Sequence, residues 1–181
     1  MLKTILLLLL AAIAMLLIYA ATRPDTFRVE RSIRIQAPPD RIYALIDDMH
    51  AFNTWNPYER KDPAIKGRYG NTTRGKGALY AWESEKVGTG QMEIVDSTLV
   101  TKVTMKLDFV KPFEAHNLVD FTLQPDGETT LVTWVMSGPS PYFSKVMQVF
   151  FSMDKMVGKD FEDGLANLKT IAEKPRSTTQ Q

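Results

Sequence analysis

The sequence predicts an α+β fold in which one curved antiparallel sheet wraps around a long C-terminal helix, preceded by an N-terminal transmembrane helix. An uncharged apolar run opens the chain, a series of segments with period-two alternation follows, and a helical period returns near the end. Alternating segments have one dry and one wet face, and the short turns between them favour an antiparallel meander. A helix laid across the dry face of a curved sheet leaves space beneath it.

The 181 residues divide into three predicted parts. Residues 1–22 form a transmembrane anchor, and residues 23–172 have the length of one ordinary domain with a single core. Residues 173–181 are polar, and we expect them to form a disordered tail.

The anchor is predicted from residues 4–22, which carry no charge and nearly span a bilayer core as a helix. A cleaved signal peptide is the alternative, but its apolar region is shorter and ends in small residues at defined positions. Here Tyr19 and Thr22 interrupt those positions. Tyr19 followed by Arg23 and Pro24 fits the end of a retained anchor, because tyrosine suits the headgroup level and proline stops the helix.

The charges that flank the anchor bear on its orientation. Lys3 lies on one side, whereas Arg23 and four more arginines up to Arg41 lie on the other, which favours a domain on the cytoplasmic side. Most of these arginines belong to a predicted folded strand, however, and charges of folded domains weigh less in orientation than those of short loops.

The first elements of the domain differ in period. Residues 27–35 alternate as a strand, with Arg31 as a charged residue among the inward ones. A Pro-Pro-Asp run at 38–40 marks a helix start, and apolar residues then recur at helical spacing up to Met49. Residues 50–62 mix aromatic residues with Asn and Pro, which predicts a short helical turn and a loop.

Strands fill the chain from Lys66 onward, and a helix ends it. The strands are separated by turn signals at Gly70-Asn71, Glu85-Lys86, Ser97-Thr98, Pro112 and Asp126-Gly127. After Pro141 the helical period returns and continues to Ile171, which predicts one long amphipathic helix, bent near Ser152.

Composition excludes several classes of function. Lys3 is the single basic residue of the first 22, so the remainder carries 21 basic and 21 acidic residues, and we expect no nucleic acid partner. The chain has no cysteine and two histidines, which argues against thiolate chemistry and against a metal site. Glycines at 75, 77, 88 and 90 precede no helix N-terminus, so they are expected as strand bends and not as a phosphate loop. No cofactor is expected.

The inward residues of the predicted sheet and helix are rich in tryptophan and methionine. Each alone is best explained as core packing, whereas together they also fit an adaptable ligand pocket, because methionine is unbranched and polarizable. Asn117 shares this alternation and would add a polar group. The candidate cavity residues are Trp55, Tyr80, Trp82, Met92, Met105, Phe109, Asn117, Phe121, Trp134, Met136, Met153 and Met156.

Three charged or titratable residues are candidate functional groups. Arg31 among inward residues predicts a salt bridge at the sheet edge, or alternatively a polar handle for a ligand carboxylate or headgroup. His116 is expected on the wet face of its strand, and His50 at a helix end. Sequence spacing places no serine or carboxylate beside either histidine, so a nucleophilic triad is not predicted.

The chain also resembles a known family, the polyketide cyclase/dehydrase-type members of the START-like (SRPBCC, helix-grip) superfamily. The resemblance covers nearly the whole domain in order, through RSIRIQAPPDRIYALIDD (31–48), FNTWNPYERKDP (52–63), GKGALYAWES (75–84), VGTGQMEI (87–94), FVKPFEA (109–115), VTWVMSG (132–138) and MDKMVGKDFEDGLANLK (153–169). It implies the helix-grip fold, with a deep apolar cavity between sheet and C-terminal helix that holds lipids, steroids, polyketides or similar molecules. It does not imply catalysis.

The leading hypothesis is therefore a membrane-tethered, noncatalytic binding or transfer domain for a hydrophobic small molecule or lipid. The second is an enzyme that folds or dehydrates a hydrophobic substrate, with Arg31, Asn117 or a tyrosine as polar group. The third is a protein-interaction scaffold whose interior is filled and whose surface binds a protein partner.

Overall fold

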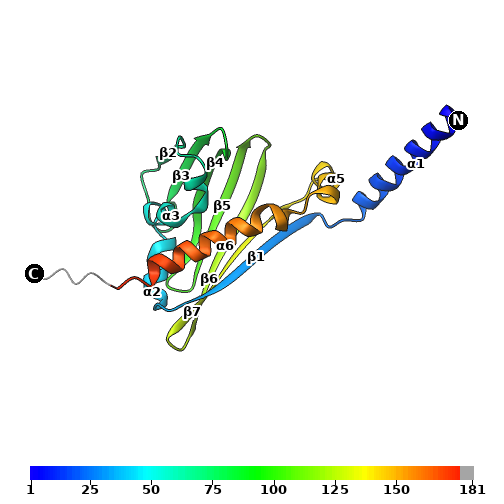
Figure 1. Ribbon diagram of the computed structural model, residues 1–181. Helices are drawn as coiled ribbons and strands as arrows, with labels where there is room; N and C mark the ends of the chain where they lie inside the picture. Colours follow the sequence, from blue (N-terminus) through cyan, green and yellow to red (C-terminus); the bar gives the residue numbers. More distant parts are fainter. Residues whose placement is uncertain (176–181) are drawn as a thin grey trace, which may run out of the picture.

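A computed structural model of the chain describes residues 1–175. Within these residues a single antiparallel sheet of seven strands has the order β1-β7-β6-β5-β4-β3-β2 (Figure 1). The strands are β1 (Thr26–Ile35), β2 (Lys66–Tyr69), β3 (Leu79–Ser84), β4 (Gly88–Thr98), β5 (Lys102–Lys111), β6 (Ala115–Asp126) and β7 (Thr129–Pro139).

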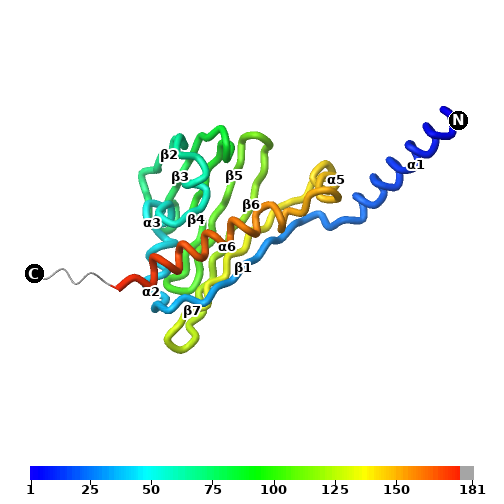
Figure 2. The backbone as a smooth tube through the Cα atoms, in the orientation of Figure 1, coloured from blue at the N-terminus to red at the C-terminus, as the bar shows by residue number. Residues whose placement is uncertain are grey.

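Helices occupy one face of the sheet and the N-terminal end of the chain. They are α1 (Leu2–Ala21), α2 (Pro39–Ile46), α3 (Met49–Trp55), α4 (Pro57–Lys61), α5 (Tyr142–Phe150) and α6 (Met153–Ala172). The long α6 crosses the sheet, while α1 and the end of α6 lie at opposite ends of the molecule (Figure 2). The predicted fold class, a curved antiparallel sheet with a long C-terminal helix and an apolar N-terminal helix, is confirmed.

The first strand of the domain is the neighbour of the last strand in the sheet. β1 pairs with β7 along its whole length, so that Arg31 lies opposite Trp134. The register of β4 against β5 shifts at Thr89/Gly90, which bends the sheet. A Cβ at Gly90 would lie 2.5 Å from the Asp108 carbonyl oxygen, so this strand bend requires glycine. Gly75 and Gly77 were also expected as strand bends, but they lie in the loop before β3 with positive φ.

The helical region after β1 is divided more finely than the sequence predicts. Asp48 caps α3 by accepting hydrogen bonds from the backbone N–H groups of His50 (2.8 Å) and Ala51 (3.1 Å). This cap starts a new helix at Met49, where one helix was expected to continue. His50 therefore lies in the first turn of α3 and does not end a helix.

The predicted long C-terminal helix is two helices. Phe151 and Ser152 have extended backbone, with ψ of 114° and 128°, which separates α5 from α6. The two helices have different partners: Lys145 of α5 pairs with Asp25, whereas Asp154 of α6 pairs with Arg31 of β1. A break between them allows each helix to follow its own partner.

The hydrophobic core fills one end of the space between sheet and helices. Helix α6 contributes Phe161 from its middle and Leu165 and Leu168 from its C-terminal half, each at most 1% exposed. These side chains belong to one cluster with buried residues of the sheet and of α2 and α3, among them Ile35, Ile42, Ile46, Met49, Phe52, Trp55, Met105, Phe121, Leu123 and Val132. The packed end of the domain is therefore the end distant from α1.

Two features let α6 approach the sheet closely. Gly164 lies against the Trp134 ring, where a Cβ would come within 2.7 Å of the indole, and Gly158 lies against the Arg31 guanidinium. Arg31 donates to both carboxylate oxygens of Asp154 (2.7 and 3.0 Å) and to Glu162 (2.8 Å). These hydrogen bonds fix β1 to the N-terminal half of α6 and raise the pKa of Arg31.

The apolar α1 leaves the domain beside α5. By length and composition, α1 is long enough and apolar enough to cross a membrane. The Tyr142 hydroxyl of α5 donates to the Leu17 carbonyl oxygen of α1 (2.9 Å). At the other end of the chain, Glu173 accepts from the Gln36 backbone N–H (2.7 Å), and the rest of the predicted tail, residues 176–181, lies outside the described residues.

Leu165 tests the contribution of α6 to the core. The substitution Leu165→Ala removes a side chain that is 1% exposed, and we expect a loss of about 2–5 kcal/mol in the free energy of unfolding. Lys155→Ala, at an exposed position of the same helix, should change it by no more than about 0.5 kcal/mol. Denaturant unfolding followed by tryptophan fluorescence measures both, and equal effects would contradict this assignment of the core.

Candidate functional site

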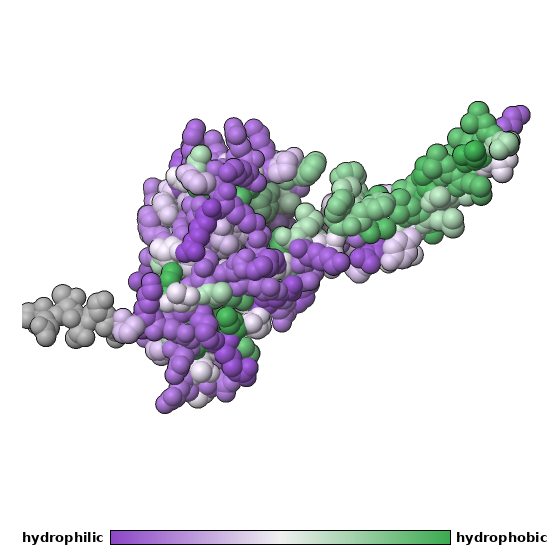
Figure 3. All heavy atoms as spheres, viewed as in Figure 1, coloured by the Kyte–Doolittle hydropathy of each residue, from purple (hydrophilic) through white to green (hydrophobic). Residues whose placement is uncertain are grey.

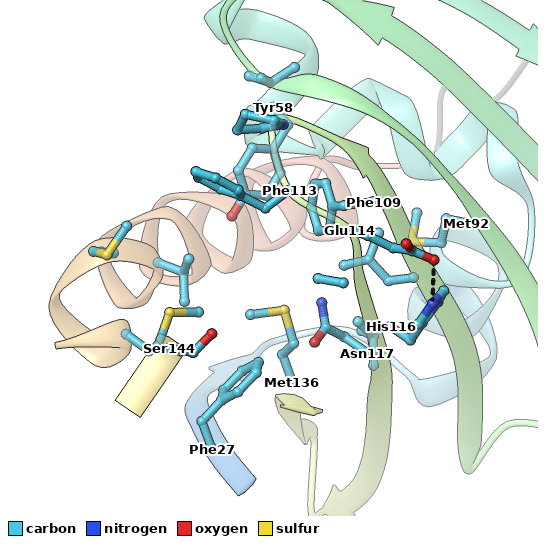
Figure 4. A pocket seen from close by; sticks show the side chains of 18 of the residues that line it. Phe27, Tyr58, Met92, Phe109, Phe113, Glu114, His116, Asn117, Met136 and Ser144 are labelled. Atoms are coloured by element: carbon cyan, nitrogen blue, oxygen red, sulfur yellow. Dashed lines mark hydrogen bonds and ion pairs between the residues drawn. The ribbon is translucent and has the colours of Figure 1, made fainter. Parts of the chain in front are cut away.

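A cavity of about 1120 Å³ lies between the sheet and the N-terminal half of α6, with α5 at its open end. Small-molecule pockets are commonly about 300–1,000 Å³, so this space is large for a domain of one core. Its walls are mainly apolar and aromatic side chains from β1, β3, β4, β5, β6, β7, α5 and α6 (Figure 4).

The structure brings most of the candidate cavity residues to this space. The lining includes Tyr80, Trp82, Met92, Phe109, Asn117, Trp134, Met136, Met153 and Met156. Trp55, Met105 and Phe121 do not line it, although the alternation or spacing puts them on the inward side. All three are fully buried in the packed end of the domain.

An aromatic cluster divides the cavity from the packed core. Trp134 stacks on Phe161 with ring centroids 4.1 Å apart and an interplanar angle of 7°. Both residues line the cavity, and behind them Trp55 and Phe121 contact Trp134 at centroid distances of 5.7 and 5.0 Å. The cavity floor is therefore rigid, since each ring is held by others at close-packed distances.

Asn117 places an amide inside the cavity. It is 7% exposed, lines the space beside Met136, and makes no side-chain hydrogen bond with any residue between 1 and 175 (Figure 4). The indole N–H of Trp134 is likewise without a partner in the described part of the chain. Buried polar groups are normally hydrogen-bonded, so the Asn117 amide is available to a bound molecule, whereas the Trp134 N–H is enclosed by protein.

The tyrosines of the cavity stay protonated. Burial raises the pKa of Tyr80, and so does its hydrogen bond to Glu59, whose carboxylate accepts from the hydroxyl at 2.5 Å. Burial also raises the pKa of Tyr58, with Asp160 as a further cause. Near neutral pH both residues are hydroxyl donors and not bases.

His116 lies at the rim, where it contacts two carboxylates. Its Nε2 is 3.2 Å from Glu114 (Figure 4). Its Nδ1 is 2.7 Å from Asp108, and this hydrogen bond is the main reason that the pKa of His116 is raised. Its side chain is 58% exposed, as expected for the wet face. No serine takes part in these contacts.

Arg31 does not line the cavity. Its guanidinium is occupied by Asp154 and Glu162, which corresponds to the salt bridge expected at the sheet edge. Among residues 1–175, no group of three or more His, Cys, Asp or Glu side chains is arranged to hold a metal ion.

The residues at the mouth of the cavity are not among those predicted from the sequence. Phe27, Phe113, Phe143, Met147 and Phe151 all line it, and three of them come from α5 or the residue after it. The spacing of Phe143 and Met147 was interpreted as part of the core face of a long helix. Phe113 lies in the short β5–β6 turn, where alternation carries no information.

Solved structures share this fold. Protein CV1439 from Chromobacterium violaceum aligns with a TM-score of 0.59 at 15% identity over 84% of this chain and 100% of its own. The KanY protein aligns with a TM-score of 0.60 at 15% identity, covering 82% of this chain and 99% of its own. DynU16, from the dynemicin biosynthetic locus, aligns with 0.57 at 17% identity over 83% of this chain and 48% of its own.

Among curated proteins, none is significantly similar to this chain in sequence. A family model does match, over residues 26–173, which includes every strand of the sheet and all of α6. The fold, the cavity and this match agree, and the chain belongs to the family of polyketide cyclase / dehydrase and lipid transport proteins.

Proposed function

We propose that the protein is a membrane-tethered, noncatalytic binding or transfer domain, which holds a hydrophobic small molecule or lipid in the cavity beneath α6. The observation that carries this proposal is the cavity itself, about 1120 Å³ of mainly apolar space in the interior of a single domain. A collapsed interior would have favoured the protein-interaction scaffold, and the open space supports a ligand instead.

The tether would be formed by residues 4–22 of the anchor, residues 1–22. Support comes from the apolar α1, which emerges beside the open end of the cavity and carries large exposed side chains along its length. The arginines that follow α1 favour the cytoplasmic side for the domain, residues 23–172.

Binding is favoured over catalysis by the ionisation of the cavity groups. A general base that works near neutral pH needs a pKa close to that range. Tyr58 and Tyr80 are shifted away from it, and His116 sits at the rim with its nitrogens paired to Asp108 and Glu114. A cyclase or dehydratase would act through Asn117 or a tyrosine hydroxyl, or through the charged and titratable residues that also line the cavity, among them Glu59, Lys61 and His116.

The polar groups of the cavity indicate the kind of ligand. The Asn117 amide offers a donor NH2 group and an acceptor oxygen, while the surrounding walls are mainly apolar. A molecule with a long apolar body and a hydroxyl or carbonyl group would satisfy them.

Narrowing the cavity should weaken binding. The chain of residues 23–181 keeps the core cluster, none of which comes from α1, and we expect it to copurify from a bacterium with an apolar molecule. Met136→Trp places a larger side chain in the cavity and should reduce the bound amount about tenfold or more, whereas the volume-conserving Met136→Leu should retain it. Mass spectrometry of organic extracts measures the content. Empty extracts, with no uptake of added fatty acids or hydrophobic dyes, would contradict the proposal.

Removing the cavity amide should change the selectivity for ligands. Asn117→Leu deletes the hydrogen-bonding group at similar volume, so we expect the affinity for a medium-chain alcohol to fall about 2- to 10-fold, the value of one hydrogen bond. The alkane of the same length should bind to this variant at least as well as it binds to the unsubstituted protein. Displacement of a hydrophobic dye compares the two ligands, and an equal change for both would show that Asn117 does not contact the ligand.

A further inference from the structure

Helix α5 has a reversed burial pattern. Its Lys145 is 7% exposed and pairs with Asp25, while its largest apolar side chains are exposed. Phe143, Met147 and Phe150 recur at helical spacing on this outer face, and the two phenylalanines are 66% and 63% exposed. A short helix on a water-soluble domain normally shows the opposite arrangement.

These side chains belong to a larger apolar surface that surrounds the entrance of the cavity. We call it the mouth patch, and it consists of Val110, Phe113, Phe143, Met147, Phe150, Phe151 and Met156, each exposed. Five of the seven also line the cavity, all but Val110 and Phe150. The ring of exposed apolar groups and the opening to the interior are thus the same place.

The mouth patch is continuous with the apolar surface of α1. The hydrogen bond from Tyr142 to the Leu17 carbonyl oxygen fixes α5 against α1. Figure 3 shows that apolar side chains cover α1, continue over α5 and reach the adjoining end of the domain, whereas the rest of the visible face is mainly polar. Whatever covers α1 therefore also reaches the mouth patch.

We propose that the mouth patch inserts into the surface of the bilayer that α1 spans, so that the cavity opens into the leaflet and takes a lipid-soluble ligand directly from it. The inference rests on the membrane tether of the proposed function. Aromatic and aliphatic residues on one face of a short helix partition into the boundary between headgroups and acyl chains. A ligand that passes through this opening remains in apolar surroundings throughout.

Insertion, and not charge, would drive this contact. The residues after the anchor carry 21 basic and 21 acidic side chains, which gives no net attraction to anionic headgroups. Phosphatidylcholine should therefore be sufficient as the lipid.

The chain contains no cysteine, so single-cysteine variants can report on individual positions. The full chain is reconstituted in phosphatidylcholine nanodiscs and labelled with an environment-sensitive fluorophore at Phe150→Cys or Phe113→Cys. Leu99→Cys is the matched control, because Leu99 is an equally exposed apolar residue, 74%, in the β4–β5 turn at the other end of the sheet. Leu10→Cys reports on insertion of α1.

We expect lipids with spin labels near the headgroup to quench positions 150 and 113 about twofold or more over position 99. If position 10 is quenched but positions 150 and 113 are quenched no more than position 99, the inference is overturned and the tether stands. A position 10 exposed to water would overturn the tether, and the inference with it. Protection of position 150 from a water-soluble quencher without quenching by lipid would assign the patch to a second copy of the chain, and would also overturn the inference.

Discussion

The seating of α6 on the sheet is the constraint on which the rest of the domain depends. Its C-terminal half packs directly on the core through Leu165 and Leu168, with Gly164 bringing the helix against Trp134. Its N-terminal half is held at the edge strand by the Arg31 hydrogen bonds to Asp154 and Glu162. One rigid helix thus has a packed half and a half that bridges open space, and the cavity persists because the helix cannot collapse onto the sheet.

The packed half and the open half of α6 correspond to the two ends of the domain. The packed core lies at the end distant from α1, the aromatic pair Trp134 and Phe161 forms the floor, and the cavity widens toward α5. At that end the burial of side chains reverses, since Lys145 is buried while Phe143 is exposed. In the proposed function, storage of an apolar ligand and attachment to a membrane would use adjacent surfaces. The break at Phe151 and Ser152 would then allow α5 to face the membrane while α6 covers the cavity.

Alternation in the sequence predicts which face of the sheet a side chain occupies. It does not predict whether that side chain lies at the packed end or at the cavity. It correctly indicated the sheet, and it put Met92 and Met136 inward, where they line the cavity. Met105 and Phe121 obey the same alternation but lie farther toward the packed end, which only the register and the path of α6 determine. The apolar stripe of α5 is predicted as core, because periodicity does not distinguish a face that packs on protein from one that is exposed at the surface.

The central claim is that the cavity between the sheet and α6 accepts a ligand. Methyl NMR of the methionines in residues 23–181 tests this claim most directly. Met92, Met136 and Met153 line the cavity, whereas Met49 and Met105 are fully buried in the core and serve as internal controls. On addition of a medium-chain alcohol, the first three methyl signals should shift and saturate while the two core signals stay in place. Unchanged signals at Met92 and Met136 would contradict the claim.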